Sequence, residues 1–158
     1  MYLKFPIYFS PVKAKILDTA TELFLNLGFK SVTMDDLAEQ LGISKKTIYS
    51  HFSNKTELVR ECTLGLFHKI ANGIDCICKE DKNPIEELYE IKRFALLNLK
   101  NEKSSPQYQL KKYYPQIYST LHKMQFELFK DCVRCNILMG MEQGIYRGNL
   151  AVEFVTRM

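Results

Sequence analysis

A long stretch near the end of the chain carries apolar side chains at the spacing of one α-helix face. Successive apolar positions are separated by 4, 3, 4, 4, 3 and 4 residues, and they are Ile117, Leu121, Met124, Leu128, Cys132, Cys135 and Met139. Because a β-strand would need strict alternation, this pattern predicts one buried helix of about 24 residues after Pro115. A helix of this length needs other helices to cover its apolar face, so a helical bundle is favoured.

Helical periodicity also dominates the rest of the chain. The predicted helices cover residues 12–27, 34–41, 45–51, 55–79, 84–99, 107–113 and 117–139, and a further element begins near Leu150. Thr33, Ser44 and Asn54 are suited to cap the second, third and fourth of these helices, and Gly28 and Gly42 are suited to end the first two. The sequence contains no convincing strand pattern, so we expect an all-α fold.

Two further helices have predictable buried faces. The expected apolar positions are Leu58, Cys62, Leu66, Ile70, Ile74 and Ile77 in the helix that follows Asn54, and Leu88, Ile91, Ala95 and Leu99 in the helix that starts at Pro84.

The overall composition is that of one ordinary globular domain or two small ones. The chain has 158 residues, of which 46% are hydrophobic and 25% charged, and the net charge of +4 permits a polyanionic partner without requiring one. The apolar run within residues 1–10 is short and is interrupted by Pro6, so it does not fit a signal peptide. No window approaches the roughly 20 apolar residues of a membrane helix, which predicts a cytoplasmic protein with no membrane partner.

The five cysteines allow two interpretations. An odd number of cysteines without a secretory signal indicates reduced thiols. Cys132-x-x-Cys135 and Cys76-x-Cys78 are compatible with a metal or thiol sensor, but Cys132 and Cys135 lie on the predicted apolar stripe. Core packing is therefore the favoured interpretation, and no metal or other cofactor is predicted.

Two short helices around Gly42 form the most informative part of the chain. The first has an apolar face, whereas the second has only Ile48, followed by Phe52. Such a pair is typical of the helix-turn-helix, whose second helix enters the DNA major groove. Burial of the two apolar residues leaves outward a donor-rich set without acidic groups, namely Lys45, Lys46, Thr47, Tyr49, Ser50 and His51. A glycine corner of this kind also occurs in bundles that bind no DNA.

Residues 13–62 resemble the DNA-binding domain of the TetR/AcrR family of bacterial transcriptional regulators. The matching residues are Lys15-Ile-Leu-Asp-Thr-Ala20, Leu23-Phe24, Gly28-Phe29, Thr33, Leu37-Ala38, Leu41-Gly42-Ile43-Ser44, Thr47-Ile48-Tyr49, His51-Phe52 and Lys55-Thr-Glu-Leu58. The resemblance implies a three-helix DNA-binding domain over residues 11–56. A long helix would join it to a helical ligand-binding and dimerisation domain over residues 57–158.

The resemblance also implies roles for single residues. Positions matching Lys45, Lys46 and Tyr49 face base edges or nearby backbone, and Ser50 stands where a variable side chain tunes sequence choice. Positions matching Thr33, Thr47, His51 and Lys55 usually hold phosphates. The predicted DNA contacts are Thr33, Ser44, Lys45, Lys46, Thr47, Tyr49, Ser50, His51 and Lys55. Because lysine can donate to guanine O6 and N7, the two adjacent lysines favour a half-site containing G.

For the C-terminal part, the resemblance implies a small-molecule effector and a homodimer. An aromatic-rich region offers candidate effector contacts, namely Phe94, Tyr108, Tyr118, His122 and Phe126, although core packing uses the same residue types. Gly144-Ile-Tyr-Arg147 resembles the family's turn before its eighth helix. Members are generally longer and form their dimer through the last two helices. We therefore expect an incomplete regulatory domain. Three alternatives stay open: the sequence is a fragment, the chain dimerises in a different way, or it does not dimerise.

These observations predict a ligand-responsive repressor that binds a palindromic operator as a dimer. An enzyme is disfavoured, because no Ser/His/Asp or Cys/His set, phosphate-binding glycine loop or carboxylate pair has credible spacing. A protein-interaction bundle with a degenerate DNA-binding motif is the second alternative. The sequence leaves open the effector, the operator, and the choice between repression and activation.

Overall fold

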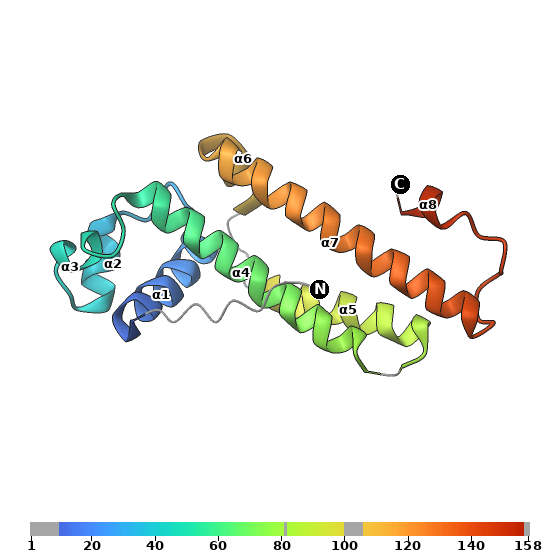
Figure 1. Ribbon diagram of the computed structural model, residues 1–158. Helices are drawn as coiled ribbons and strands as arrows, with labels where there is room; N and C mark the ends of the chain where they lie inside the picture. The colour runs from blue at the N-terminus through green and yellow to red at the C-terminus, as the bar shows by residue number, and fades with distance from the viewer. Residues whose placement is uncertain (1–9, 81, 100–105, 157–158) are drawn as a thin grey trace. The chain divides into compact units, whose positions relative to one another are not determined.

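The computed structural model describes residues 10–80, 82–99 and 106–156, and the regular structure in these ranges is helical (Figure 1). The helices are α1 (Pro11–Leu27), α2 (Met34–Leu41), α3 (Lys45–Tyr49), α4 (Lys55–Cys78), α5 (Pro84–Leu99), α6 (Pro106–Tyr113), α7 (Pro115–Glu142) and α8 (Val152–Val155). The all-α prediction is therefore confirmed for these ranges. The interpretations of residues 1–9 and of the polar segment 101–105 lie outside the described residues.

The chain divides into two units by its internal packing. Within the described ranges, unit 1 comprises residues 10–63 and 106–114, and unit 2 comprises residues 64–99 and 115–156. The predicted division at residue 56 differs from this one in two respects. The first turns of α4 belong to unit 1, because Leu58, Val59 and Cys62 are buried in its core. In addition, α6 groups with unit 1 rather than with the rest of the C-terminal half.

Unit 1 is built around apolar faces contributed by its first four helices. The side chains in its core include Ile16, Ala20, Phe24, Leu37, Ala38, Ile48, Phe52, Leu58 and Val59. Phe24 lies near the centre, with the ring of Phe29 at 5.2 Å between centroids. In α1 and α2, the buried residues are spaced by three or four residues, which places them on one face of each helix. The helix α3 ends at Tyr49, two residues before the end of the predicted segment 45–51.

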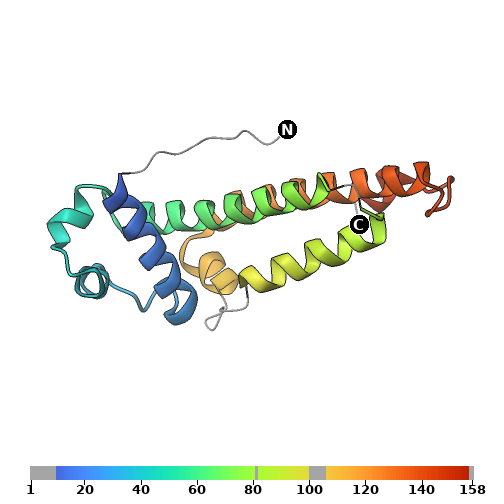
Figure 2. The ribbon, with the colours of Figure 1, turned by 90° about the horizontal axis from the view of Figure 1, so that it is seen from below.

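Unit 2 contains the second part of α4 with α5, α7 and α8. Figure 2 shows α5 running antiparallel to that part of α4, and α5 and α8 both pack on α7. A buried polar network joins α5 and α7: Nδ2 of Asn136 donates to the Pro84 carbonyl at 2.8 Å and to Oε1 of Glu87 at 2.7 Å. The hydroxyl of Tyr146 donates to Oδ1 of Asn136 at 3.0 Å.

The register of two predicted buried faces in unit 2 is only partly correct. On α7, Ile117, Leu121 and Leu128 are buried, but Cys135 is exposed and Asn136 is buried in its place. The hydrogen bonds of Asn136 turn its polar side chain inward, which an apolar pattern does not reveal. The prediction that Cys135 packs in the core is therefore wrong.

The predicted faces of α5 and α4 also need correction. Leu88 was expected to be buried but is exposed, because α5 turns Glu87 toward Asn136 instead. The side chain of Leu99 lies outside the described residues. On α4, the prediction missed Phe67 and Ala71, which are both buried.

Candidate nucleic-acid interface

A reciprocal capping box closes the N-terminus of α2. Oγ1 of Thr33 accepts a hydrogen bond from the Asp36 backbone N–H at 3.1 Å, and the Asp36 carboxylate accepts one from the Thr33 backbone N–H at 2.7 Å. The Thr33 residue is exposed, and its hydroxyl keeps a proton to donate. The helix N-terminus adds partial positive charge, so this position suits a phosphate oxygen.

The capping box predicts a pH-dependent loss of stability in an Asp36→Ala variant. Hydrogen bonds from Thr33, first from its backbone and then from its side chain, hold the pKa of Asp36 below its ordinary value. A lowered folded-state pKa stabilises the fold above the unfolded pKa of about 4, and this contribution is lost as pH falls through the folded value. We expect Asp36→Ala to lower the Tm at pH 7 and the difference from the parent chain to shrink below pH 4.

The matched control for this measurement is Glu39→Ala, which removes an exposed carboxylate from the same helix but none that binds Thr33. Its effect on Tm should depend less on pH over this range. A Tm difference for Asp36→Ala that stays constant from pH 7 to pH 3 would contradict the stabilising role of the capping box.

The turn between α2 and α3 depends on the conformation of Gly42. This residue has φ +64°, the left-handed region that glycine adopts without steric cost. The Gly42 N–H donates to the Glu39 carbonyl and the Ile43 N–H donates to the Ala38 carbonyl, each at 3.1 Å. The chain then enters α3 at Ser44, whose Oγ accepts from the Thr47 N–H at 3.1 Å. The predicted stop at Gly42 and cap at Ser44 are confirmed.

The helix α3 is held by its apolar side and presents the other side to solvent. Ile48 is fully buried and Phe52, just beyond the helix, is 1% exposed. Lys45, Lys46 and Tyr49 are exposed. Of the remaining predicted contacts, Ser44 and Ser50 are exposed and Thr47 and His51 are half-buried. The structure thus brings the predicted residues of α3 together on and around one short helix.

Lys45 has an acidic partner that the sequence analysis missed. Its Nζ lies 2.9 Å from Oδ1 of Asp35 on α2, and this hydrogen-bonded pair raises the pKa of Lys45. The predicted hydrogen-bond donors of residues 45–51 include no acidic residue, but the turn at Gly42 brings Asp35 of α2 beside Lys45. Contact with a phosphate would therefore require Lys45 to exchange its carboxylate partner for the phosphate.

The start of α4 supplies the last predicted contact. Oδ1 of Asn54 accepts from the Glu57 N–H at 2.9 Å, which confirms the predicted cap. The Lys55 ammonium lies 3.5 Å from the Lys30 carbonyl oxygen and 5.9 Å from the centroid of the Phe24 ring. Partial burial lowers the pKa of Lys55. Its ammonium therefore lies against the body of unit 1, with the Asp36 carboxylate as a nearby opposite charge.

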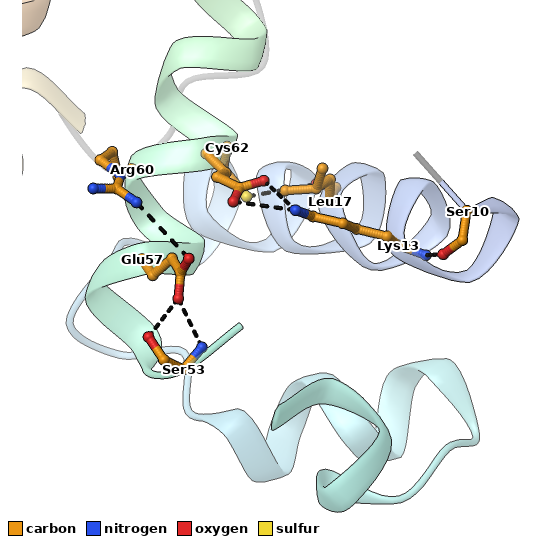
Figure 3. Close-up of polar contacts among 8 residues, drawn as sticks. Ser10, Lys13, Leu17, Ser53, Glu57, Arg60 and Cys62 are labelled. Carbon is orange, nitrogen blue, oxygen red and sulfur yellow. Dashed lines mark hydrogen bonds and ion pairs between the residues drawn. The ribbon is translucent and has the colours of Figure 1, made fainter. Parts of the chain in front are cut away.

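Polar contacts hold the first turns of α4 against α1 (Figure 3). Nζ of Lys13 forms an ion pair with Oε2 of Glu61 at 2.9 Å, and the thiol of Cys62 donates to the Leu17 carbonyl at 3.7 Å. Beside them, the Ser53 backbone N–H donates to Oε2 of Glu57 at 2.7 Å. These contacts orient the first turns of α4 relative to α1 and thereby the segment that precedes Lys55.

The helix α6 packs on the loop that connects α1 to α2. Oε1 of Gln109 accepts from the Lys30 N–H at 3.4 Å, and the ring of Tyr114, just beyond α6, meets Phe29 edge-on at 6.2 Å. Nζ of Lys30 lies 5.3 Å from the centroid of the Tyr113 ring. This loop leads directly into Thr33, so α6 is placed to influence the predicted phosphate-binding end of α2. No pattern in the sequence indicated this packing.

The predicted effector contacts do not all fall in one unit. Phe94, Tyr118, His122 and Phe126 belong to unit 2, where the rings of Tyr118 and His122 lie 5.7 Å apart. Phe126 is 44% exposed. Tyr108 belongs to unit 1 and is 63% exposed, with Nζ of Lys112 at 5.7 Å from its ring.

Comparison with known proteins supports the DNA-binding interpretation of unit 1. A family model described as "Bacterial regulatory proteins, tetR family" matches residues 16–62. The chain is also similar to the "Biofilm operon icaADBC HTH-type negative transcriptional regulator IcaR" of Staphylococcus epidermidis, with 32% identity over 81 residues. That match covers 50% of this chain and 42% of the relative, so it spans less than half of the relative's length.

Solved structures resemble the chain over a greater length. The fatty acid degradation regulator FadR from Bacillus halodurans has a TM-score of 0.72 at 17% identity, covering 95% of this chain and 79% of its own. The transcriptional regulator FadR from Bacillus subtilis, solved with stearoyl-CoA, has a TM-score of 0.67 at 21% identity, with coverage of 92% and 80%. At these identities the similarity shows the fold.

Proposed function

We propose that the chain is a sequence-specific, DNA-binding transcriptional repressor of the tetR family of bacterial regulatory proteins, whose family model matches residues 16–62. The observation that carries the proposal is the geometry of α3. Ile48 anchors this helix in the core of unit 1, and Lys46 and Tyr49 extend from it into solvent. A lysine ammonium and a tyrosine hydroxyl donate hydrogen bonds to base edges and phosphates, which an exposed helix can bring into the major groove.

The residues around α3 have a second role in the proposal. Thr33 at the N-terminus of α2 and His51 after α3 contact phosphates, and the partly buried Lys55 adds positive charge at the start of α4. Such contacts set the position of the recognition helix on the duplex without reading sequence. Thr47, in the middle of α3, also contacts a phosphate, and Ser44 and Ser50 adjust the contacts at either end of the helix.

We further propose that the protein acts as a homodimer in the cytoplasm. Two copies of α3 separated by about 34 Å would meet successive major grooves on one side of a near-palindromic operator. Occupancy of the operator blocks transcription. IcaR of Staphylococcus epidermidis is described as a negative regulator, which supports repression rather than activation for this chain.

A small apolar or aromatic molecule is the effector we propose for unit 2. The four predicted contacts in that unit, Phe94, Tyr118, His122 and Phe126, offer aromatic surface. The FadR structure with stearoyl-CoA shows that a protein of this fold can take a ligand with a long apolar chain. For the effector to release DNA, it must bind the conformation with low DNA affinity more tightly than the DNA-bound one.

Fluorescence anisotropy over a salt series tests the proposed function. The purified chain is titrated into labelled DNA from upstream of its own gene and into a scrambled duplex of equal length. We expect a preference for the upstream DNA, a linear fall of log affinity with log salt, and two chains bound per duplex. Equal binding to both duplexes at all salt concentrations contradicts sequence-specific recognition of that DNA.

The Lys45–Asp35 ion pair predicts a variant with increased DNA affinity. Asp35→Asn removes a negative charge beside the recognition helix and frees Lys45 for a phosphate. Because exposed ion pairs contribute at most about 1 kcal/mol, we expect up to roughly fivefold tighter binding at low salt, and less at high salt. Glu22→Gln on α1 changes the net charge equally and is the matched control. Equal gains for both variants would show that only net charge matters.

A further inference from the structure

The hydroxyl of Ser50, the residue that ends α3, is already engaged inside the protein. Its Oγ donates a hydrogen bond to the Thr47 carbonyl oxygen at 2.7 Å. A serine hydroxyl has a single proton to donate, and its oxygen has lone pairs that accept. Ser50 is exposed, so with its proton engaged the oxygen presents only acceptor lone pairs to a molecule that approaches α3.

The way in which α3 ends gives this hydrogen bond a structural cause. In a continuing helix, the Thr47 carbonyl would accept from the N–H of residue 51. Here the His51 N–H donates to the Ile48 carbonyl at 3.0 Å, and the Phe52 N–H donates to the same carbonyl at 3.0 Å. The Ser50 hydroxyl therefore replaces the missing helical donor. Opening its bond beneath a DNA duplex, where water is displaced, would leave the Thr47 carbonyl without a partner.

Lys46, one helical turn before Ser50, has the opposite hydrogen-bonding character. Ser50 has right-handed helical dihedral angles, so these two residues, four apart, lie on the same face of α3 with Cβ atoms about 6 Å apart. Base pairs are stacked about 3.4 Å apart, so the two side chains face bases roughly two steps apart. A lysine ammonium only donates, which suits guanine, whereas the Ser50 oxygen accepts.

We propose that Ser50 is a specificity-determining residue that reads its base as a hydrogen-bond acceptor. This inference rests on the proposed function. In the major groove, adenine N6 and cytosine N4 are the amino groups that donate, whereas guanine presents two acceptors and thymine presents O4 and a methyl group. Guanine or thymine would need the proton that Ser50 gives to Thr47. Each half-site therefore carries adenine or cytosine opposite Ser50, about two steps from the guanine that Lys46 contacts.

Selection of duplexes from a random library by the full chain tests the base preference. The parent chain is compared with Ser50→Ala, Ser50→Thr and the matched control Ser119→Ala, which removes an exposed serine hydroxyl from α7 in unit 2. We expect the parent and Ser119→Ala to select adenine or cytosine at one position of each half-site. Ser50→Thr should keep this preference, because a threonine hydroxyl can form the same bond to the backbone. Ser50→Ala should lose it at that position only.

Base analogues separate base reading from a structural role of Ser50. In the selected duplex, adenine at this position is replaced by purine, which lacks the 6-amino group, or cytosine by 2-pyrimidinone, which lacks the 4-amino group. Fluorescence anisotropy should show roughly twofold to tenfold weaker binding of the analogue duplex by the parent chain, as expected for one hydrogen bond between neutral groups. Ser50→Ala should bind the two duplexes equally. A purely structural role of Ser50 would give the same loss in both proteins.

The possible results are distinct. Guanine or thymine at the position that Ser50→Ala ceases to select, an unchanged consensus in Ser50→Ala, or an equal analogue penalty in both proteins overturns the acceptor role of Ser50 and leaves the proposed function intact. A parent chain that enriches no sequence from the library would refute the proposed function, and the role of Ser50 with it.

Discussion

Replacing Lys46 and Tyr49 together by alanine is expected to abolish the preference for operator DNA over a scrambled duplex. Both side chains are exposed on α3, and each well-formed contact to a base edge contributes about 1–3 kcal/mol of discrimination. The loss of both contacts should therefore weaken operator binding on the order of 100-fold or more, with a much smaller loss on the scrambled duplex. Anisotropy titrations of both duplexes at one fixed salt concentration measure this directly.

The chain offers a matched control for this double variant. Tyr89 and Lys92 on α5 are exposed and have the same residue types at the same spacing of three, although in the opposite order. Their double alanine variant removes the same charge and the same aromatic ring from unit 2. It should bind the operator like the parent chain. If the α3 variant retained the preference of the parent chain, the assignment of α3 as the recognition helix would be wrong.

The parts of the site that sequence predicted well are those with local causes. The caps at Thr33, Ser44 and Asn54 depend on side chains that bond backbone within three residues, and the stop at Gly42 depends on its own φ. Interactions between residues so close in the chain can be predicted from the local sequence alone. The outward side of α3 follows in the same way, because the burial of Ile48 fixes which side chains remain exposed.

The features that sequence did not predict depend on contacts between distant segments. Asp35 meets Lys45 only after the turn at Gly42 reverses the chain, so the charge pattern of α3 alone indicated an unpaired lysine. The packing of Gln109 on the loop at Lys30 brings α6 into unit 1 across a separation of 79 residues, half of the chain's length. The burial of Asn136 was not predicted, because an apolar pattern does not indicate which polar residues will have buried hydrogen-bond partners.

The backbone conformation of Gly28 and the packing of α6 against it both oppose a larger side chain at this position. Gly28 has φ +92° and ψ 151°, a region that residues with a Cβ rarely adopt, and its N–H donates to the Phe24 carbonyl at 2.9 Å. A Cβ built there would lie 2.4 Å from Nε2 of Gln109. Gly28→Ala is therefore expected to destabilise unit 1 by about 1–3 kcal/mol from backbone strain, with an additional cost for displacing Gln109. Urea unfolding followed by circular dichroism measures the change.

A double variant separates the two causes. Gln109→Ala removes the clash but leaves the strained backbone, so adding it to Gly28→Ala should recover only the part of the loss that came from the clash. Gly148→Ala serves as the control, because a Cβ there meets open space and the change in the unfolded chain is the same. Because Gly28 begins the loop that leads to Thr33, Gly28→Ala should also weaken DNA binding at temperatures where the chain remains folded. Unfolding of Gly28→Ala at the same urea concentration as Gly148→Ala would show that neither the backbone conformation nor the α6 contact contributes to the stability of unit 1.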